Sequence, residues 1–255
     1  MTLADWYAAH GRHDLLWRRT RDRWAILVSE VMLHQTQVQR VAAVFEGFMG
    51  RFPTPEAMAD AGPGAVITAW GRLGYPRRAR RLHDAAVVLR DHGWPDDLTT
   101  LPGVGRYTAA AVVAQADDVD VPAIEVNIRR VAERVSGGQL TERAAEEATV
   151  RIGRPLRGRD RLLALMDVGA VLCRPREPRC TECPLRRRCA TRAPLPDETR
   201  HRQPAFAGSF RQRRGVILAR LRSAPVPVDE LDADALASLV SDGLAVVRCG
   251  RARLP

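Results

Sequence analysis

The sequence contains no lysine, since all 40 of its basic residues are arginines. No side-chain amine is therefore available for covalent chemistry through a Schiff base. No apolar run approaches the roughly 18 residues that a membrane-spanning helix needs. The amino-terminal residues also lack the basic start and the apolar stretch of a secretory signal. We therefore expect a soluble protein of the reducing cytoplasm with no membrane contact.

The charge of the chain is strongly positive, with a formal net charge of +10 and an isoelectric point of about 10.6. Such values favour a polyanionic partner, of which nucleic acid is the commonest. A generally basic protein from a genome rich in G and C explains the composition equally well. The chain has 255 residues, of which 45% are hydrophobic. It can therefore form one large domain or two modest ones without the help of disulfides.

Apolar residues recur at steps of three and four through most of the first 190 residues, which indicates helices packed on a core. Helices are expected within 24–50 and over approximately 55–69, 77–92, 108–116, 128–135 and 144–152. Thr54 followed by Pro55 predicts a helix N-cap with proline at the first helical position. Strand-like alternation is almost absent before residue 200, so the body of the protein is expected to be all-α.

The carboxyl-terminal part follows a different pattern. Residues 191–213 are rich in proline and charge and are expected to form a linker. Beyond them, residues 214–222 and 233–241 predict two short helices. An apolar run after Asp242-Gly243 favours a small β-hairpin. Together these elements, residues 214–255, resemble a truncated winged-helix unit.

Four of the five cysteines lie close together in the sequence, spaced C-x6-C-x2-C-x5-C. They are Cys173, Cys180, Cys183 and Cys189. Four such thiolates suit either a tetrahedral zinc ion or a cubane iron–sulfur cluster, and donor softness does not distinguish the two. Arginines between these cysteines place positive charge where DNA phosphates could be met. Cys249 lies far away and is interpreted as an unrelated thiol.

Residues 101–112 read LPGVGRYTAAAV. Gly103 and Gly105 stand between an apolar turn and a new helix, where glycine allows positive φ and close approach of a partner. The amino terminus of the following helix offers backbone N–H groups and a positive dipole to a phosphate. Such a turn by itself is usually no more than a tight connection.

Glu30 lies in the segment VSEVMLHQTQV, among Val28, Val31 and Leu33. A lone glutamate on a helix normally faces solvent. Apolar neighbours would instead raise the pKa of its carboxyl, so that it carries a proton near neutral pH. Glu30 is therefore a candidate general acid.

Seven segments of the chain resemble, in order and over roughly residues 6–190, the MutY-like adenine DNA glycosylases of the helix-hairpin-helix and endonuclease III superfamily. The segments read WYAAHGRHDLLW, WAILVSEVMLHQTQV, FEGFMGRFPTP, WGRLGYPRRARRLHDAA, LPGVGRYTAAAV, EVNIRRVAERV and LMDVGAVLCRPREPRC. The resemblance implies a two-domain helix-hairpin-helix glycosylase fold whose four cysteines hold a 4Fe–4S cluster. We expect a six-helix domain over residues 22–135 and a cluster domain formed by residues 1–21 and 136–190. The implied partner is duplex DNA with a mismatched or damaged base, bound by a monomer in the bacterial nucleoid.

The resemblance also implies roles for individual residues. Glu30 is the acid that protonates the departing base, because the glycosidic bond breaks more easily when the leaving group is neutral. Glu125 is the carboxylate that stabilises the cationic sugar. Tyr107 and Asn127 match a catalytic tyrosine and an active-site asparagine, and Gln35 is the wedge that fills the gap left by the flipped nucleotide. Further DNA contacts are expected at His34, Leu101, Gly103, Gly105, Arg106 and Thr108.

The sequence departs from the family at several of these positions. Glu125 replaces an aspartate, His34 replaces the first glutamine of QQTQ, and Pro76 replaces the second aromatic residue of GYY. Leu163 stands where the family carries Glu or Gln to hold adenine, so discrimination of adenine is expected to be weaker. The tail is too short for an oxidised-guanine-reading domain. Thymine or uracil mismatch excision, and a catalytically silent DNA-damage binder, therefore remain alternatives.

Bifunctional relatives use a lysine of the hairpin to cut the strand, and that position is Tyr107 here. The resemblance and the absence of lysine together predict a monofunctional glycosylase that leaves an abasic site.

Overall fold

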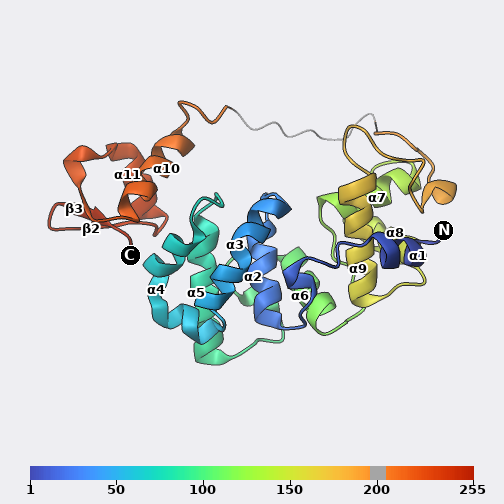
Figure 1. The fold of residues 1–255 in the computed structure, drawn as a ribbon, viewed down its shortest axis with the longest axis horizontal. Coiled ribbons are helices and arrows are strands. Elements are labelled where there is room, and N and C mark those ends of the chain that lie inside the picture. The colour runs from blue at the N-terminus through green and yellow to red at the C-terminus, as the bar shows by residue number, and fades with distance from the viewer. Residues whose placement is uncertain (196–204) are drawn as a thin grey trace. The chain divides into compact units, whose positions relative to one another are not determined.

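The computed structural model describes residues 1–195 and 205–255. The chain divides into two compact units: Met1–Glu30 with Val104–Arg200, called the first unit here, and Val31–Gly103 with His201–Pro255, called the second unit. Both units are mainly helical, as the all-α prediction required (Figure 1). In the part of the chain that the structure describes, no helix is both long and apolar enough to cross a membrane.

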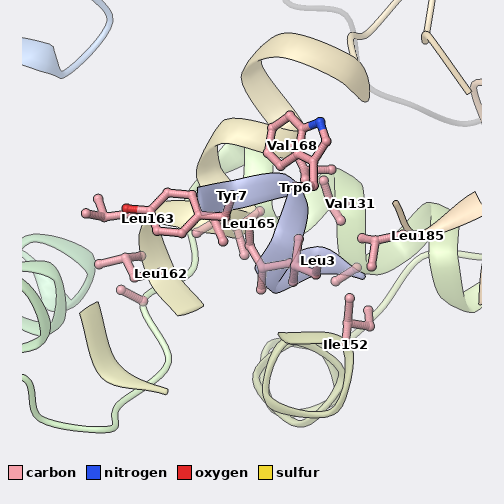
Figure 2. Packing of buried hydrophobic residues seen from close by; sticks show 14 of the residues in the cluster. Leu3, Trp6, Tyr7, Val131, Ile152, Leu162, Leu163, Leu165, Val168 and Leu185 are labelled. Carbon is pink, nitrogen blue, oxygen red and sulfur yellow. The ribbon is translucent and has the colours of Figure 1, made fainter. Parts of the chain in front are cut away.

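The first unit is built mainly from five helices and the start of a sixth. They are α1 (Leu3–His10), α6 (Arg106–Ala116), α7 (Val126–Ser136), α8 (Glu142–Gly153), α9 (Gly158–Asp167) and the beginning of α2 (Arg23–Leu33). Short turns of helix complete it: η1 (Leu16–Arg18), the π-helical turn η3 (Val168–Leu172) and η4 (Arg186–Arg188). Side chains of α1 pack against α9 and η3 in the core, where Leu3, Trp6 and Tyr7 lie close to Leu165 and Val168 (Figure 2).

The second unit contains three helices from the body of the chain and the whole described tail. The body helices are α3 (Val38–Arg51), α4 (Pro55–Trp70) and α5 (Arg77–His92), with the turn η2 (Leu98–Thr100). Thr54 accepts a hydrogen bond from the N–H of Ala57 and Pro55 is at the first helical position, which confirms the predicted N-cap. Gly62 interrupts α4 with φ of +78° directly before Pro63, so that α4 is kinked there.

The tail consists of α10 (Phe210–Leu221), α11 (Ala233–Ser241), the turn η5 (Val228–Glu230) and a three-stranded antiparallel sheet. The strands are β1 (Val226–Pro227), β2 (Val246–Arg248) and β3 (Arg251–Arg253), in the order β1-β3-β2. The predicted hairpin is β2-β3, and its two central residues, Cys249 and Gly250, both have positive φ, as a tight hairpin turn requires.

The predicted end of the linker at residue 213 is wrong, because α10 begins at Phe210 rather than at residue 214. The hydroxyl of Ser209 accepts a hydrogen bond from the N–H of Gln212 and caps the helix there. The part of the expected linker from 196 to 204 lies outside the described residues.

The compact units divide the chain at Glu30 and Val104, whereas the sequence predicted divisions at residues 21 and 135. The packing of α6 and α7 accounts for the difference. Ala111 and Ala114 of α6, and Val131 of α7, belong to the same hydrophobic cluster as Leu3 and Leu162. Both helices therefore contribute to the core of the first unit.

Candidate active site and cysteine loop

Glu30 lies near the end of the first unit's part of α2 and is only 3% exposed. Asp22 starts this helix by accepting hydrogen bonds from the N–H groups of Trp24 and Ala25, both at 3.1 Å. Both carboxyl oxygens of Glu30 have partners in α6. The hydroxyl of Tyr107 donates to Oε2 at 3.0 Å, and Nε2 of Gln115 donates to Oε1 at 2.7 Å.

Burial raises the pKa of Glu30, because removal from water disfavours the charged form. The hydrogen bonds from Gln115 and Tyr107 oppose this shift, and the negative charge of Glu125 reinforces it. The predicted burial of Glu30 and its raised pKa are therefore confirmed. The role of Glu30 as general acid stays a prediction. Burial also raises the pKa of Tyr107 well above its usual value, so this residue stays a neutral hydroxyl.

Glu125 is the N-cap residue of α7. Its Oε1 accepts the N–H of Ile128 at 2.9 Å, and its Oε2 accepts Nδ2–H of Asn127 at 2.9 Å. The longer side chain of glutamate therefore still reaches the first turn of its own helix. Burial raises the pKa of Glu125, while the backbone and Asn127 hydrogen bonds and the charge of Arg130 oppose that effect.

Arg130 connects this carboxylate to the cysteine loop. It is 8% exposed, and its Nη2 donates to Oδ1 of Asn127 and to the carbonyl of Gly169, both at 2.7 Å. Its Nε donates to the carbonyl of Cys173 at 2.7 Å. A guanidinium only donates, so the oxygen of the Asn127 side chain must face it and the amide N–H must face Glu125.

A buried ion pair lies in the same unit. Asp167 is fully buried and accepts hydrogen bonds from Arg18 at 2.6 and 2.8 Å and from Arg12 at 2.6 and 2.9 Å. Burial raises the pKa of Asp167, but the two guanidinium groups outweigh burial and hold the pKa below its usual value. The positive charge of Arg18 also favours ionisation of Glu30.

All four clustered cysteines line one cavity. Arg134 and Leu185 are among the other residues of its wall. Arg134 is 1% exposed, and its Nη1 lies 3.5 Å from Sγ of Cys173 and 2.8 Å from the carbonyl of Arg174. Burial raises the pKa of the Cys183 thiol to about 11. Among residues 1–195 and 205–255, no three His, Cys, Asp or Glu side chains converge as a single metal ion would need.

The expected wedge residue belongs to the second unit. Gln35 is exposed and has φ of +54°, in the loop between α2 and α3. Arg78 of α5 holds this loop, because its guanidinium donates to the carbonyls of Val31, at 2.8 Å, and His34, and to Oγ1 of Thr36. Burial and the nearby charge of Arg78 lower the pKa of His34.

The glycine-rich turn has the predicted conformation at one of its two glycines. Gly103 has φ of +80°, and a Cβ there would meet Cβ of Arg81 at 2.8 Å. Gly105 has an ordinary φ of −94° and is the N-cap of α6, with open space where a Cβ would lie. Arg106 is exposed and lies 3.7 Å from Glu146. The side chains of Leu101 and Thr108 are buried, at 2% and 1% exposure, so a DNA contact there would use the backbone.

Sequence reasoning missed three residues that support the two carboxyls of the first unit: Gln115, Arg130 and Gly169. It also missed Arg78, which holds the Gln35 loop in the second unit. A Cβ on Gly169 would lie 2.7 Å from Cβ of Asn127, so this glycine is required by space. The glutamine had a detectable signal, since it is a polar residue at the end of a helix rich in alanine and valine. No sequence signal distinguishes Arg78 or Arg130, because many other arginines lie near them in the sequence. Leu163 is buried in the hydrophobic cluster of the first unit and offers no polar group.

Residues 28–155 match the model of the family described as HhH-GPD superfamily base excision DNA repair protein. The solved structures that resemble the chain include a thermostable thymine-DNA glycosylase. The match to it has a TM-score of 0.66 at 29% identity and covers 74% of this chain and 91% of that one. A non-covalent endonuclease III–DNA complex has the same fold, with a TM-score of 0.64 at 23% identity over 74% of this chain and 91% of that one. The chain belongs to this superfamily of base excision DNA repair proteins.

Within the superfamily, the chain is similar over nearly its whole length to proteins named adenine DNA glycosylase. It is 41% identical to that of Mycolicibacterium smegmatis, over 95% of this chain and 90% of the relative. It is 42% identical to that of Mycobacterium tuberculosis, over 99% of this chain and 92% of the relative. A thymine-DNA glycosylase of Aeropyrum pernix is 33% identical over 73% of this chain and 91% of that protein.

Proposed function

We propose that this protein is a monofunctional DNA glycosylase that excises adenine paired with 8-oxoguanine or guanine from duplex DNA. The observation that carries the proposal is the buried carboxyl of Glu30, with Tyr107 on one of its oxygens and a second carboxylate, Glu125, close enough to raise its pKa. The similarity to adenine DNA glycosylases over almost the whole chain supports adenine as the base.

In this mechanism, protonated Glu30 gives its proton to the base as the bond between base and sugar breaks. The bonding electrons leave with the base, which departs neutral, and the sugar becomes an oxocarbenium-like cation. Glu125 in its ionised form stabilises that cation. Water then forms a bond to the sugar carbon and loses a proton, which leaves an abasic site. Asn127 and Ile128 hold Glu125, and Arg130 holds Asn127.

We further propose that the protein has no lyase activity. The position in the hairpin where bifunctional enzymes carry a lysine is Tyr107, and the chain has no lysine elsewhere. The free base and an abasic site should therefore form without a covalent enzyme–DNA adduct. Borohydride treatment during the reaction is expected to trap nothing, and a trapped adduct of the intact protein would contradict this proposal.

The cysteine loop fits an iron–sulfur cluster. One cavity is lined by Cys173, Cys180, Cys183 and Cys189, and four cysteine thiolates are the usual ligand set of a 4Fe–4S cluster. The guanidinium of Arg134 offers positive charge to the thiolate of Cys173. When bound, a 4Fe–4S cluster would cross-link this loop through its thiolate bonds. The purified protein is expected to absorb broadly in the visible, and zinc without iron on elemental analysis would contradict this assignment.

The proposed partner is duplex DNA with a mismatched base, bound by a monomer in the bacterial nucleoid. The net positive charge of the chain and the exposed Arg106 at the amino terminus of α6 support this choice. Gln35 is the candidate to fill the space of the flipped nucleotide, because it is exposed on a loop that Arg78 holds.

Excision of thymine or uracil from mismatches is a second candidate function. The apolar Leu163 and the similarity to thymine-DNA glycosylases favour it. Single-turnover assays on duplexes with A, T or U opposite G or 8-oxoguanine distinguish the candidates. Excision of adenine supports the proposal, and excision of T or U alone supports the alternative. DNA binding with no excision of any base selects a silent binder of DNA damage and contradicts both.

A further inference from the structure

Gln115 is a buried polar residue on the last turn of α6, and the mechanism above gives it no role. It is 1% exposed, and its side-chain amide donates to Oε1 of Glu30 at 2.7 Å. Its backbone carbonyl accepts a hydrogen bond from Arg159, whose second terminal nitrogen donates to the carbonyl of Arg18. Gln115 is therefore held at both its side chain and its backbone, with its amide directed at the catalytic carboxyl.

We propose that Gln115 is a positioning residue that holds Glu30, directs its proton to Oε2 and sets the upper pH limit of base excision. The role in catalysis rests on the proposed function, whereas the effect on Glu30 can be measured without it. An amide N–H can only donate, so Oε1 must accept from Gln115. The proton of the neutral carboxyl then belongs on Oε2. The hydroxyl of Tyr107 lies there and can either donate or accept.

Several other charges and dipoles face Glu30. Tyr107, from the same helix as Gln115, donates to Oε2, while Glu125 at the start of α7 disfavours the carboxylate. Arg18 of η1 favours the carboxylate but is paired with Asp167. Burial, like the charge of Glu125, disfavours the carboxylate and raises the pKa of Glu30. Gln115 thus keeps the acid from becoming so weak that it no longer gives up its proton.

Removal of the amide donor should raise the pKa of Glu30. A hydrogen bond to the charged form favours that form, and its loss shifts the equilibrium toward the protonated acid. For a hydrogen bond of ordinary strength to a charged group, the expected shift is about one pH unit. The alkaline limb of the pH–rate profile should move upward by the same amount, while the maximal rate falls because the carboxyl is less well held.

The test uses Gln115→Met, which keeps the length of the side chain but has no donor. Carboxyl-labelled glutamate reports the titration of Glu30 by carbon NMR, with the signal assigned by its loss in Glu30→Gln. Single-turnover excision of adenine opposite 8-oxoguanine is measured over the same pH range. Gln115→Glu is a second variant of nearly identical shape. It replaces the donor by a carboxyl and should raise the pKa of Glu30 further.

Thr149→Val is the matched control, because Thr149 is a buried polar residue of the same unit whose Oγ1 has no hydrogen-bond partner among the described residues. It should leave both the Glu30 titration and the pH–rate profile unchanged. An unchanged Glu30 titration in both Gln115 variants overturns the inference, whether or not the protein excises adenine. A shifted titration in a protein that excises no base at any pH supports the role of Gln115 while refuting the proposed function.

Discussion

At the residue scale, the proposed chemistry depends on two carboxyl groups in different surroundings. Glu30 has both oxygens bonded to uncharged side chains, whereas Glu125 is bonded to a backbone N–H and lies near Arg130. Burial raises the pKa of each. The surroundings of Glu125 are the better suited to a carboxylate, because a helix amino terminus and a guanidinium both favour the ionised form.

Glu30→Gln should abolish excision and at the same time stabilise the folded protein at alkaline pH. A general acid contributes about 100-fold to 10,000-fold, so the rate should fall by at least about 100-fold. The folded pKa of Glu30 is raised, so its contribution to stability is present at acidic pH and is lost as the pH rises through that pKa. Glutamine carries no charge, so the variant does not lose this stability as the pH rises. The free energy of unfolding in urea, compared at pH 5 and pH 8, checks the sign.

The advantage of Glu30→Gln over the unmodified protein should therefore be larger at pH 8 than at pH 5. An advantage that does not change with pH would mean that Glu30 is not buried as described. An unchanged excision rate would remove Glu30 from the mechanism.

At the scale of elements, α7 and the turn η3 form one support for the site. Asn127 lies on the first turn of α7 and Gly169 lies in η3, with no room for a side chain between them. Arg130 of α7 bonds to Asn127, Gly169 and the carbonyl of Cys173. The position of Asn127 therefore depends on both elements and on the start of the cysteine loop.

Gly169→Ala should displace Asn127 and destabilise the protein by about 1–3 kcal/mol, the usual effect of an extra methyl group in a packed interior. Excision should fall as well, because the Asn127 amide no longer holds Glu125. Thermal unfolding and single-turnover rates measure the two effects. Gly47→Ala is the control, since Gly47 lies in α3 with nothing near its added methyl group. That variant should keep full activity, and a Gly169→Ala protein with both properties unchanged would refute the packing argument.

At the scale of the whole molecule, the dominant property is its positive charge. The net charge is +10 and every basic side chain is an arginine. Arginine binds phosphate with a planar, bidentate geometry and never loses its charge at accessible pH. Neutralisation of DNA phosphates releases counterions, so the affinity for DNA should depend strongly on salt.

The logarithm of the association constant should fall linearly with the logarithm of salt concentration, with a slope of about −0.9 for each phosphate neutralised. The Glu30→Gln protein allows this measurement without turnover of the DNA. Arg187→Ala removes an exposed arginine of the cysteine loop and should reduce the slope by about one. Arg248→Ala in strand β2 is a matched control on another surface. Equal slopes for the Glu30→Gln protein and for its Arg187→Ala and Arg248→Ala derivatives would show that the cysteine loop does not contact DNA.

Much of the fold follows from local patterns in the sequence. Apolar spacing predicts α2 to α8 within a few residues, but it predicts no helix over α1 or α9. Thr54-Pro55 predicts where α4 begins. The start of α10 was not predicted, because the residues around the N-cap Ser209 are rich in charge and resemble a linker. Cysteine spacing predicts one shared site, and all four thiols line one cavity. These features depend on residues a few positions apart in the sequence, so local sequence patterns are sufficient to predict them.

The sequence by itself determined most of the helices, the candidate acid and the cysteine set, because periodicity, apolar neighbours and spacing are properties of short segments. Only the tertiary structure decided which polar residues support them. The Gln115 amide meets a carboxylate 85 positions away, and Arg130 meets a carbonyl 43 positions away. Such contacts depend on how helices pack across the core. No local pattern distinguishes an arginine that turns inward from one that faces water.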